Sequence, residues 1–107
     1  MLFAEQRRWE RHPFSEQIRV LHSTAGGETI IHGRGVRLSK GGICLFAAAD
    51  LPLGTQIQIE FETSPQGRIQ IPGKVRNRQV YLYGIEFVAD RLEERRSLAW
   101  FRTEFCN

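Results

Sequence analysis

Three arginines crowd the start of the chain, at Arg7, Arg8 and Arg11, just before the first apolar run. A guanidinium group presents a planar fork of donors that fits a phosphate or the O6/N7 edge of guanine, and its flat face stacks on purines. Two such groups, four residues apart on a flexible leader (residues 1–16), could close over a ligand with two negative charges. Taken alone, this segment also fits an ordinary solvated basic tail.

A second segment, residues 35–43, combines an arginine, a serine and two glycines. If the apolar neighbours of Arg37 face a core, the period of two in a strand sends Arg37 and Ser39 outward together. The serine hydroxyl can then meet a ligand, while Gly41 and Gly42 permit positive φ and a close approach of the backbone. A plain hairpin turn is the alternative explanation.

No group of residues predicts catalysis. His12, His22 and His32 are ten residues apart in sequence and show no metal-ligand spacing, and Ser39 has no identifiable base. The chain also lacks a P-loop, a Gly-x-Gly-x-x-Gly and a Gly-x-Ser-x-Gly motif. We therefore expect no enzyme, no cofactor and no metal site.

Composition bounds the protein class. A chain of 107 residues with 41% hydrophobic content suffices for a single domain, residues 1–107. No apolar run reaches membrane-spanning length and the first residues are charged, so we expect a cytoplasmic protein without membrane insertion. Cys44 and Cys106 are too far apart in sequence for a local metal-ligand pair, and both are expected to be reduced. The net charge of +3 is compatible with an anionic partner.

Short alternating runs bounded by glycine and proline predict six antiparallel strands in a closed or nearly closed barrel, residues 17–89. The expected strands begin at Ile18 and Val20 and continue with residues 30–38, 43–47, 55–62, 68–76 and 80–88. Predicted turns lie at residues 25–27, 40–42, 51–54, 64–67 and 77–79. Pro72 and Gly73, inside the fifth run, predict a bulge or bend.

The last segment, residues 90–105, has the pattern of a helix, with Asp90 and Glu93 spaced as a capping box. Its apolar residues fall on two sides: Leu98, Phe101 and Phe105 on one, and Leu92, Ala99 and Trp100 on the other. One interpretation is a helix that plugs an open barrel end, with Trp100 partly exposed. The other is a surface for a protein partner or for self-association, which leaves a homodimer open.

Together, the two basic segments resemble the PilZ domain family. That family shows an Arg-x-x-x-Arg motif before its first strand and an Asp/Asn-x-Ser-x-x-Gly motif some tens of residues later. Residues 7–11 match the first motif, and residues 37–42 match the second at Ser39 and Gly42 but carry Arg37 at its first position. The resemblance continues in the turn at residues 51–55, the strand at residues 83–87 and the helix that starts at residues 93–96.

The resemblance implies a six-stranded antiparallel β-barrel with a C-terminal helix, whose arginine leader folds over cyclic di-GMP on the outer barrel surface. The binding residues implied are Arg7, Arg8, Arg11, Arg37, Ser39, Gly41 and Gly42. Binding would order the leader and signal to a protein partner.

Two alternatives differ in the ligand. At the position of Arg37 the family has a residue that accepts hydrogen bonds from guanine, whereas arginine only donates, so the chain could instead be a PilZ-like adaptor that binds proteins and no nucleotide. Tyr81 and Tyr83 share a strand face, as in barrels that stack single-stranded nucleic acid. Ile85 and Phe87 lie on that same face, so core packing explains it better, and no DNA or RNA partner is expected.

Overall fold

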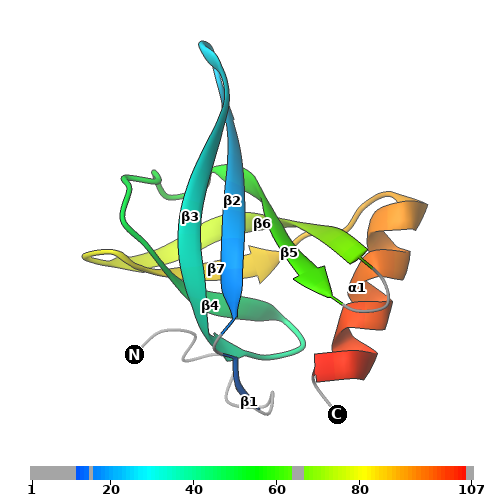
Figure 1. Cartoon of the computed structure of the whole chain (residues 1–107). Coiled ribbons are helices and arrows are strands. Elements are labelled where there is room, and N and C mark those ends of the chain that lie inside the picture. The colour runs from blue at the N-terminus through cyan, green and yellow to red at the C-terminus, as the bar shows by residue number, and fades with distance from the viewer. Residues whose placement is uncertain (1–11, 15, 64–66, 106–107) are drawn as a thin grey trace.

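The computed structural model describes residues 12–14, 16–63 and 67–105. Within these residues, seven strands precede one helix (Figure 1): β1 (His12–Pro13), β2 (Gln17–Thr24), β3 (Gly27–Leu38), β4 (Gly42–Ala47), β5 (Gln56–Thr63), β6 (Gly67–Gln79), β7 (Leu82–Phe87) and α1 (Leu92–Phe105). The mainly β architecture with a C-terminal helix confirms the predicted fold class.

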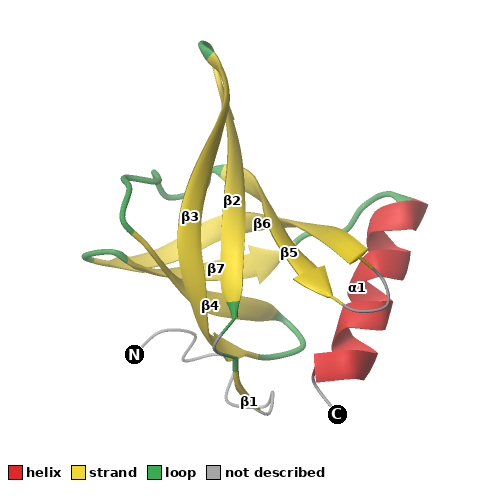
Figure 2. Cartoon of the chain, in the orientation of Figure 1, coloured by secondary structure: helices red, strands yellow, loops and turns green. Residues whose placement is uncertain are grey.

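The strands form one antiparallel sheet in the order β1-β3-β2-β5-β6-β7-β4 (Figure 2). A further pairing between β3 and β4 joins the two sides of this sheet, so that six of the strands close into a barrel. The two-residue β1 adds to β3 at its C-terminal end, where His12 pairs with Leu38.

Alternation of apolar and polar residues along each strand places the core. In β5, Ile57, Ile59 and Phe61 are buried, as a period of two requires. Tyr83 and Ile85 of β7 are fully buried in the same cluster, so core packing is the correct interpretation of that strand face. Tyr81 lies outside β7 and is exposed.

Helix α1 packs its Leu98 and Phe101 side into the barrel core. The Phe101 ring contacts the rings of Phe14, Phe61 and Phe87 edge-on, at centroid distances of 5.7, 4.9 and 5.9 Å. Trp100 is half-buried and packs against this cluster from outside. The helix therefore covers the barrel in the manner predicted for a plug.

The helix begins at Leu92, two residues later than predicted, and this changes its cap. The Glu94 carboxylate accepts hydrogen bonds from the backbone N–H groups of Asp90 and Arg91, at 3.1 and 3.0 Å. Because the third helical residue is Glu94, the expected role of Glu93 in the capping box is wrong.

In β6 the predicted turn is wrong, and the predicted bulge does not lie at Pro72. The strand runs through the expected turn at residues 77–79, and the turn lies instead at Val80 and Tyr81, with Val80 at φ 59°. The register with β5 is unbroken at Pro72, and the irregularity in the β6–β7 ladder lies between Val75 and Asn77. The Pro72 carbonyl accepts from the Val88 N–H at 3.0 Å, just past the end of β7. The nitrogen of Pro72, which has no hydrogen to donate, faces the same side and therefore interrupts no pairing within β7.

The hairpin of β2 and β3 is longer than predicted. The two strands pair continuously up to Thr24 and Gly27, with Ala25 and Gly26 as the turn, so β3 begins three residues before the expected Ile30. In Figure 1 this hairpin projects beyond the barrel at the top of the view.

Candidate functional site

The outer face of the barrel beside the end of β3 carries a transverse row of residues. Arg37 of β3 pairs with Cys44 of β4, Cys44 with Gly84 of β7, and Gly84 with Asn77 of β6. Residues paired in this way lie on the same face of a sheet. We call these four residues the outer row. Its centre has short side chains, and its β3 end carries the exposed guanidinium of Arg37.

The outer row lies opposite the core. The neighbours of Cys44 along β4, Ile43 and Leu45, are both buried in the core, so alternation directs Cys44 to the outer face. Cys44 is nevertheless only 2% exposed.

An aromatic residue borders the outer row on one side. Phe46 of β4 pairs with Arg34 of β3 and with Leu82 of β7, and its ring is 49% exposed. Tyr81 contacts this ring edge-on at 6.4 Å. Arginines and an exposed aromatic ring around short side chains suit a flat anionic ligand, because both groups stack on planar bases and the arginines also bind phosphate.

The sequence predicted that Ser39 points outward together with Arg37, and this prediction is wrong. It is only 6% exposed, and its Oγ donates to the Gly42 carbonyl at 3.4 Å, while its backbone N–H donates to the same oxygen at 2.9 Å. The strand ends at Leu38, so strand alternation does not extend to Ser39. The serine shapes the connection between β3 and β4. We call this connection, together with Gly42 at the start of β4, the 39–42 loop.

Gly42 provides a close backbone approach, but the approach is to the protein itself. A Cβ at this position would lie 2.1 Å from the Ile85 carbonyl oxygen of the adjacent strand. The sequence predicted that Gly41 and Gly42 permit positive φ, but neither glycine adopts positive φ in the structure. The Gly41 carbonyl accepts from the Phe87 N–H at 3.0 Å, so β7 fixes this side of the 39–42 loop.

The helix holds the 39–42 loop from its other side. The Nε of Arg102 in α1 donates to the Lys40 carbonyl at 2.8 Å. The loop is thus tied to α1 and to β7, and its shape depends on both elements.

The predicted leader arginines, Arg7, Arg8 and Arg11, lie outside the described residues. The structure does describe where the chain reaches the barrel. In β1, His12 pairs with Leu38 and Pro13 with Arg37, and the Phe14 N–H donates to the Val36 carbonyl at 3.1 Å. Buried Phe14 anchors this junction in the core, so the leader meets the barrel beside the outer row.

A buried ionic cluster was not found from the sequence. Glu60 of β5 is 5% exposed, and its carboxylate accepts from the Arg19 Nε at 2.6 Å and the Gln70 Nε2 at 2.7 Å, with Arg68 at 3.8 Å. Desolvation raises the pKa of Glu60, but these hydrogen bonds and the two arginine charges outweigh it and lower the pKa overall. Alternation marks Glu60 as outward, but only the register across β2, β5 and β6 reveals the cluster.

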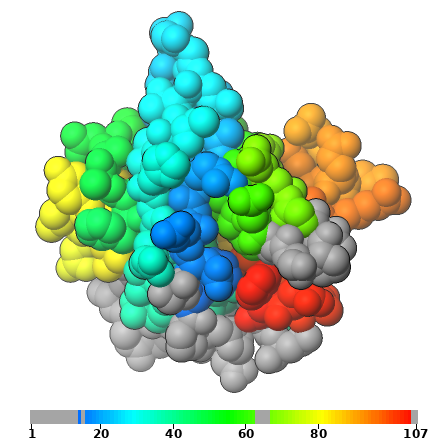
Figure 3. Space-filling view, in the orientation of Figure 1, coloured from blue at the N-terminus to red at the C-terminus, as the bar shows by residue number. Residues whose placement is uncertain are grey.

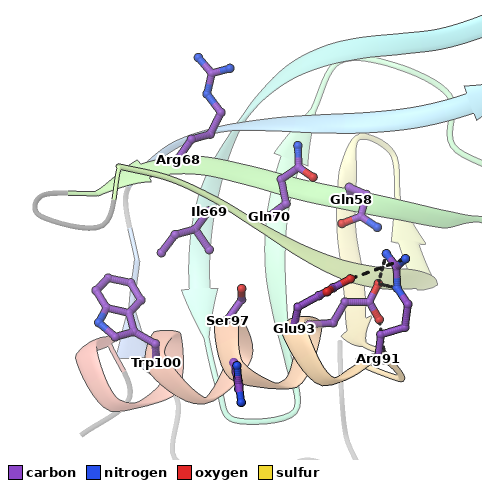
Figure 4. A pocket seen from close by; sticks show the side chains of 10 residues that line it. Gln58, Arg68, Ile69, Gln70, Arg91, Glu93, Ser97 and Trp100 are labelled. Atoms are coloured by element: carbon purple, nitrogen blue, oxygen red, sulfur yellow. Dashed lines mark hydrogen bonds and ion pairs between the residues drawn. The ribbon is translucent and has the colours of Figure 1, made fainter.

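A separate groove of about 520 Å³ lies between α1 and the strands β5 and β6 (Figure 4). Trp100 and Arg68 border it, and Arg91 on its rim is paired with Glu93 and Glu94. None of the predicted site residues in the described part of the chain lines this groove. Two carboxylates, Glu93 and Glu94, line the groove beside its arginines, whereas the outer row contains no carboxylate, so the groove is a weaker candidate for an anionic ligand.

Over the described residues, no cluster of histidine, cysteine, aspartate or glutamate could hold a metal ion. The same part of the chain contains no helix with the length and apolar character needed to cross a membrane.

Comparisons with known proteins agree with this architecture. The PilZ domain of CeSA from a cellulose-synthesizing bacterium superposes with a TM-score of 0.72 at 20% identity, over 89% of this chain and 96% of that domain. The PilZ domain of YcgR from Escherichia coli, with c-di-GMP, gives 0.62 at 16% identity, over 94% of this chain and 91% of that one. Escherichia coli YcgR in complex with c-di-GMP gives 0.62 at 18% identity, and the match covers 92% of this chain but 46% of that protein.

At the level of sequence, no curated protein matches the chain. The PilZ domain family model matches residues 5–103, which include both basic segments, the barrel and most of the helix. The chain therefore belongs to the PilZ domain family.

Proposed function

We propose that the chain is a receptor domain for cyclic di-GMP, which binds against the outer row and is clamped by the arginine leader. One observation carries the proposal: β1 pairs with the end of β3, so the leader meets the barrel beside Arg37 and the 39–42 loop. The first motif ends at Arg11, directly before β1, which supports a proposal in which both motifs contact one ligand. A family member, YcgR, has been solved with the same ligand.

Each predicted residue has a role in this proposal. Arg7, Arg8 and Arg11 supply guanidinium groups to the phosphates and to the guanine edges of the ligand. Arg37, with Arg34 nearby, binds guanine acceptors or a phosphate, in place of the acceptor that the family motif has at this position. The other predicted residues, Ser39, Gly41 and Gly42, hold the 39–42 loop in the shape that borders the site.

The proposed output is a conformational signal without chemistry. The ligand orders the leader against the barrel, and the leader and ligand together make a surface for a protein partner. The ligand leaves unchanged, so the domain needs neither a catalytic residue nor a cofactor. A bacterial second messenger is met in the cytoplasm, where we place this domain.

Isothermal titration of the purified chain with cyclic di-GMP, and with GTP as the control ligand, tests the proposal. We expect binding of cyclic di-GMP alone, and a loss of about tenfold in affinity for Arg11→Ala and for Arg37→Ala, since each removes charged hydrogen bonds. Ser39→Ala should also weaken binding. Arg96→Ala, which removes an exposed arginine of α1, is the matched control and should leave the affinity unchanged.

Two outcomes contradict the proposal at different levels. If Arg11→Ala, Arg37→Ala and Ser39→Ala all bind as the wild type does, the ligand binds elsewhere and the site assignment is wrong. If the folded wild type takes up no ligand, the receptor function is wrong.

Arg37 favours a second candidate, an adaptor that contacts proteins and binds no nucleotide. The family motif has an acceptor at this position for the N–H donors of guanine, and arginine has no acceptor to offer them. This adaptor would be selected if the titration shows no binding of cyclic di-GMP or GTP and a specific protein partner binds the chain equally well with and without either nucleotide.

A further inference from the structure

Two irregularities in the strand pairing lie at the two ends of the outer row. The β3–β4 ladder shifts register between Gly35 and Arg37, and the β6–β7 ladder shifts register between Val75 and Asn77. In each ladder one residue is left without a partner, as in a β-bulge. The two residues that follow the bulges, Arg37 and Asn77, are the two ends of the outer row.

Each bulge turns a side chain from the core to the outer face. Val75 is buried, so uninterrupted alternation would direct Asn77, two residues later, inward as well. The bulge instead pairs Asn77 with Gly84 on the outer face. In β3, Gly35 is buried and Arg37 is exposed, although they too are two residues apart. Bulges often re-aim a side chain beside a functional site, and here two of them direct polar side chains to one row.

The two ends of the row differ in what they offer a ligand. The Arg37 guanidinium only donates hydrogen bonds, whereas the Asn77 amide donates through its nitrogen and accepts through its oxygen. Within the described chain, neither side chain hydrogen-bonds to another residue. The next outward carboxylate of β7, on Glu86, is already paired with Arg76 at 3.0 Å. Asn77 therefore carries the strongest side-chain acceptor of the outer row, since the other candidate is the weakly accepting sulfur of Cys44.

The hairpin of β6 and β7, which carries Asn77, is held in place near its tip. Arg78 forms an ion pair with Asp50 of the connection between β4 and β5, and its Nε donates to the Val80 carbonyl at 2.6 Å. Its guanidinium also lies over the Tyr83 ring, 5.3 Å from the centroid. In Figure 3 the tip of this hairpin (yellow) lies beside that connection (green) at the left of the molecule. A backbone fixed in this way lowers the entropy cost of binding through Asn77.

We infer that Asn77 recognises a guanine base of the ligand, whose 2-amino group donates to the Asn77 Oδ1. The inference rests on the proposed function and supplies the acceptor that Arg37 lacks. The base lies against Cys44 and Gly84, the short residues at the centre of the row. Arg37, three strand spacings or about 14 Å away along the sheet, binds a phosphate or the guanine O6 and N7 acceptors. Asn77 is thus a specificity-determining residue.

A thermodynamic cycle between this residue and one group of the ligand tests the inference. Isothermal titration measures the affinities of wild type and Asn77→Ala for cyclic di-GMP and for cyclic di-IMP, which lacks only the 2-amino groups. Wild type should prefer cyclic di-GMP by at least about tenfold. Asn77→Ala should lose about tenfold in affinity for cyclic di-GMP and most of this preference, because the acceptor is gone.

Two further variants separate recognition of the base from an effect on the fold. Asn77→Asp keeps an acceptor oxygen and should keep the preference, because its added charge acts on the phosphates of both ligands alike. Gln79→Ala is the matched control, since it removes an exposed amide from the same strand, two residues outside the row. It should leave both affinities unchanged. Far-ultraviolet circular dichroism confirms that each variant is folded.

The outcomes distinguish this inference from the proposed function. If wild type binds cyclic di-GMP and Asn77→Ala binds it equally well, the inference is overturned and the proposed function stands. The same conclusion follows if folded Asn77→Ala binds both ligands more weakly but keeps the preference, because Asn77 then affects only the shape of the site. If wild type binds neither ligand, both the proposed function and this inference are wrong.

Discussion

At Gly42, a single missing side chain decides how closely two strands approach. The Ile85 carbonyl occupies the space that any Cβ there would need. We expect Gly42→Ala to lower the free energy of unfolding by about 1 to 3 kcal/mol, because β4 must move from β7 or distort. Chemical denaturation measures this cost. Gly26→Ala is the control: the nearest atom to its Cβ would be 3.9 Å away, so a change beyond about 0.5 kcal/mol would contradict the steric explanation.

Ser39 shows what a sequence pattern can and cannot provide at this scale. Residue type and spacing were enough to mark it as a candidate. Its orientation could not be predicted, because that depends on where β3 ends and on the bond from its hydroxyl to the Gly42 carbonyl. Gly42 was marked for a close approach of the backbone to a ligand, and the group that approaches it in the structure is the Ile85 carbonyl of β7.

Among the elements, the helix cap distinguishes two adjacent glutamates. Glu94 accepts from two backbone N–H groups, and the bond from Arg91 is the main reason that its pKa is lowered. Glu93 makes only a long ion pair with Arg91, at 3.7 Å. We therefore expect Glu94→Ala to lower the melting temperature more than Glu93→Ala does, measured by thermal denaturation at neutral pH. Equal effects would mean that the helix starts elsewhere.

The six strands of the barrel were predictable because alternation and turn residues act locally. Ile57, Ile59 and Phe61 indicated β5 and its buried face without any tertiary information. The errors fall where a neighbouring strand overrides local preference. Residues 77–79 look like a turn, but their pairing with β7 extends β6, and the turn moves to Val80, a residue that rarely adopts positive φ. Local signals could not show that β2 and β3 continue beyond the barrel.

For the whole molecule, Glu60 links stability to pH. Its pKa is lower in the folded protein than in an unfolded chain, so its stabilising contribution is present above the ordinary glutamate value of about 4.3 and is lost as the pH falls through the lower folded value. Glu94 acts in the same direction. We expect the wild type to lose stability as the pH falls below about 4.3, measured by denaturation at a series of pH values.

Glu60→Gln isolates the part of this dependence that belongs to the buried cluster. At neutral pH it should cost about 1 to 3 kcal/mol, because Arg19 loses its buried counterion. The difference from wild type should shrink as the pH falls. Glu62→Gln, on the same strand and exposed, is the control. A constant difference at every pH would show that the Glu60 charge is not responsible.

Ring closure divides the barrel into two meanders of consecutive strands, β2-β3-β4 and β5-β6-β7, which meet along two seams. Within a meander each pairing joins residues that are close in sequence. Both seams, β2–β5 and β4–β7, join residues about forty positions apart, so forming them costs more loop-closure entropy. We therefore expect the docking of the two halves to limit the folding rate. The pairing of Cys44 with Gly84 lies on the β4–β7 seam. A molecule bound over this pair would contact both meanders and slow unfolding by separation of the two.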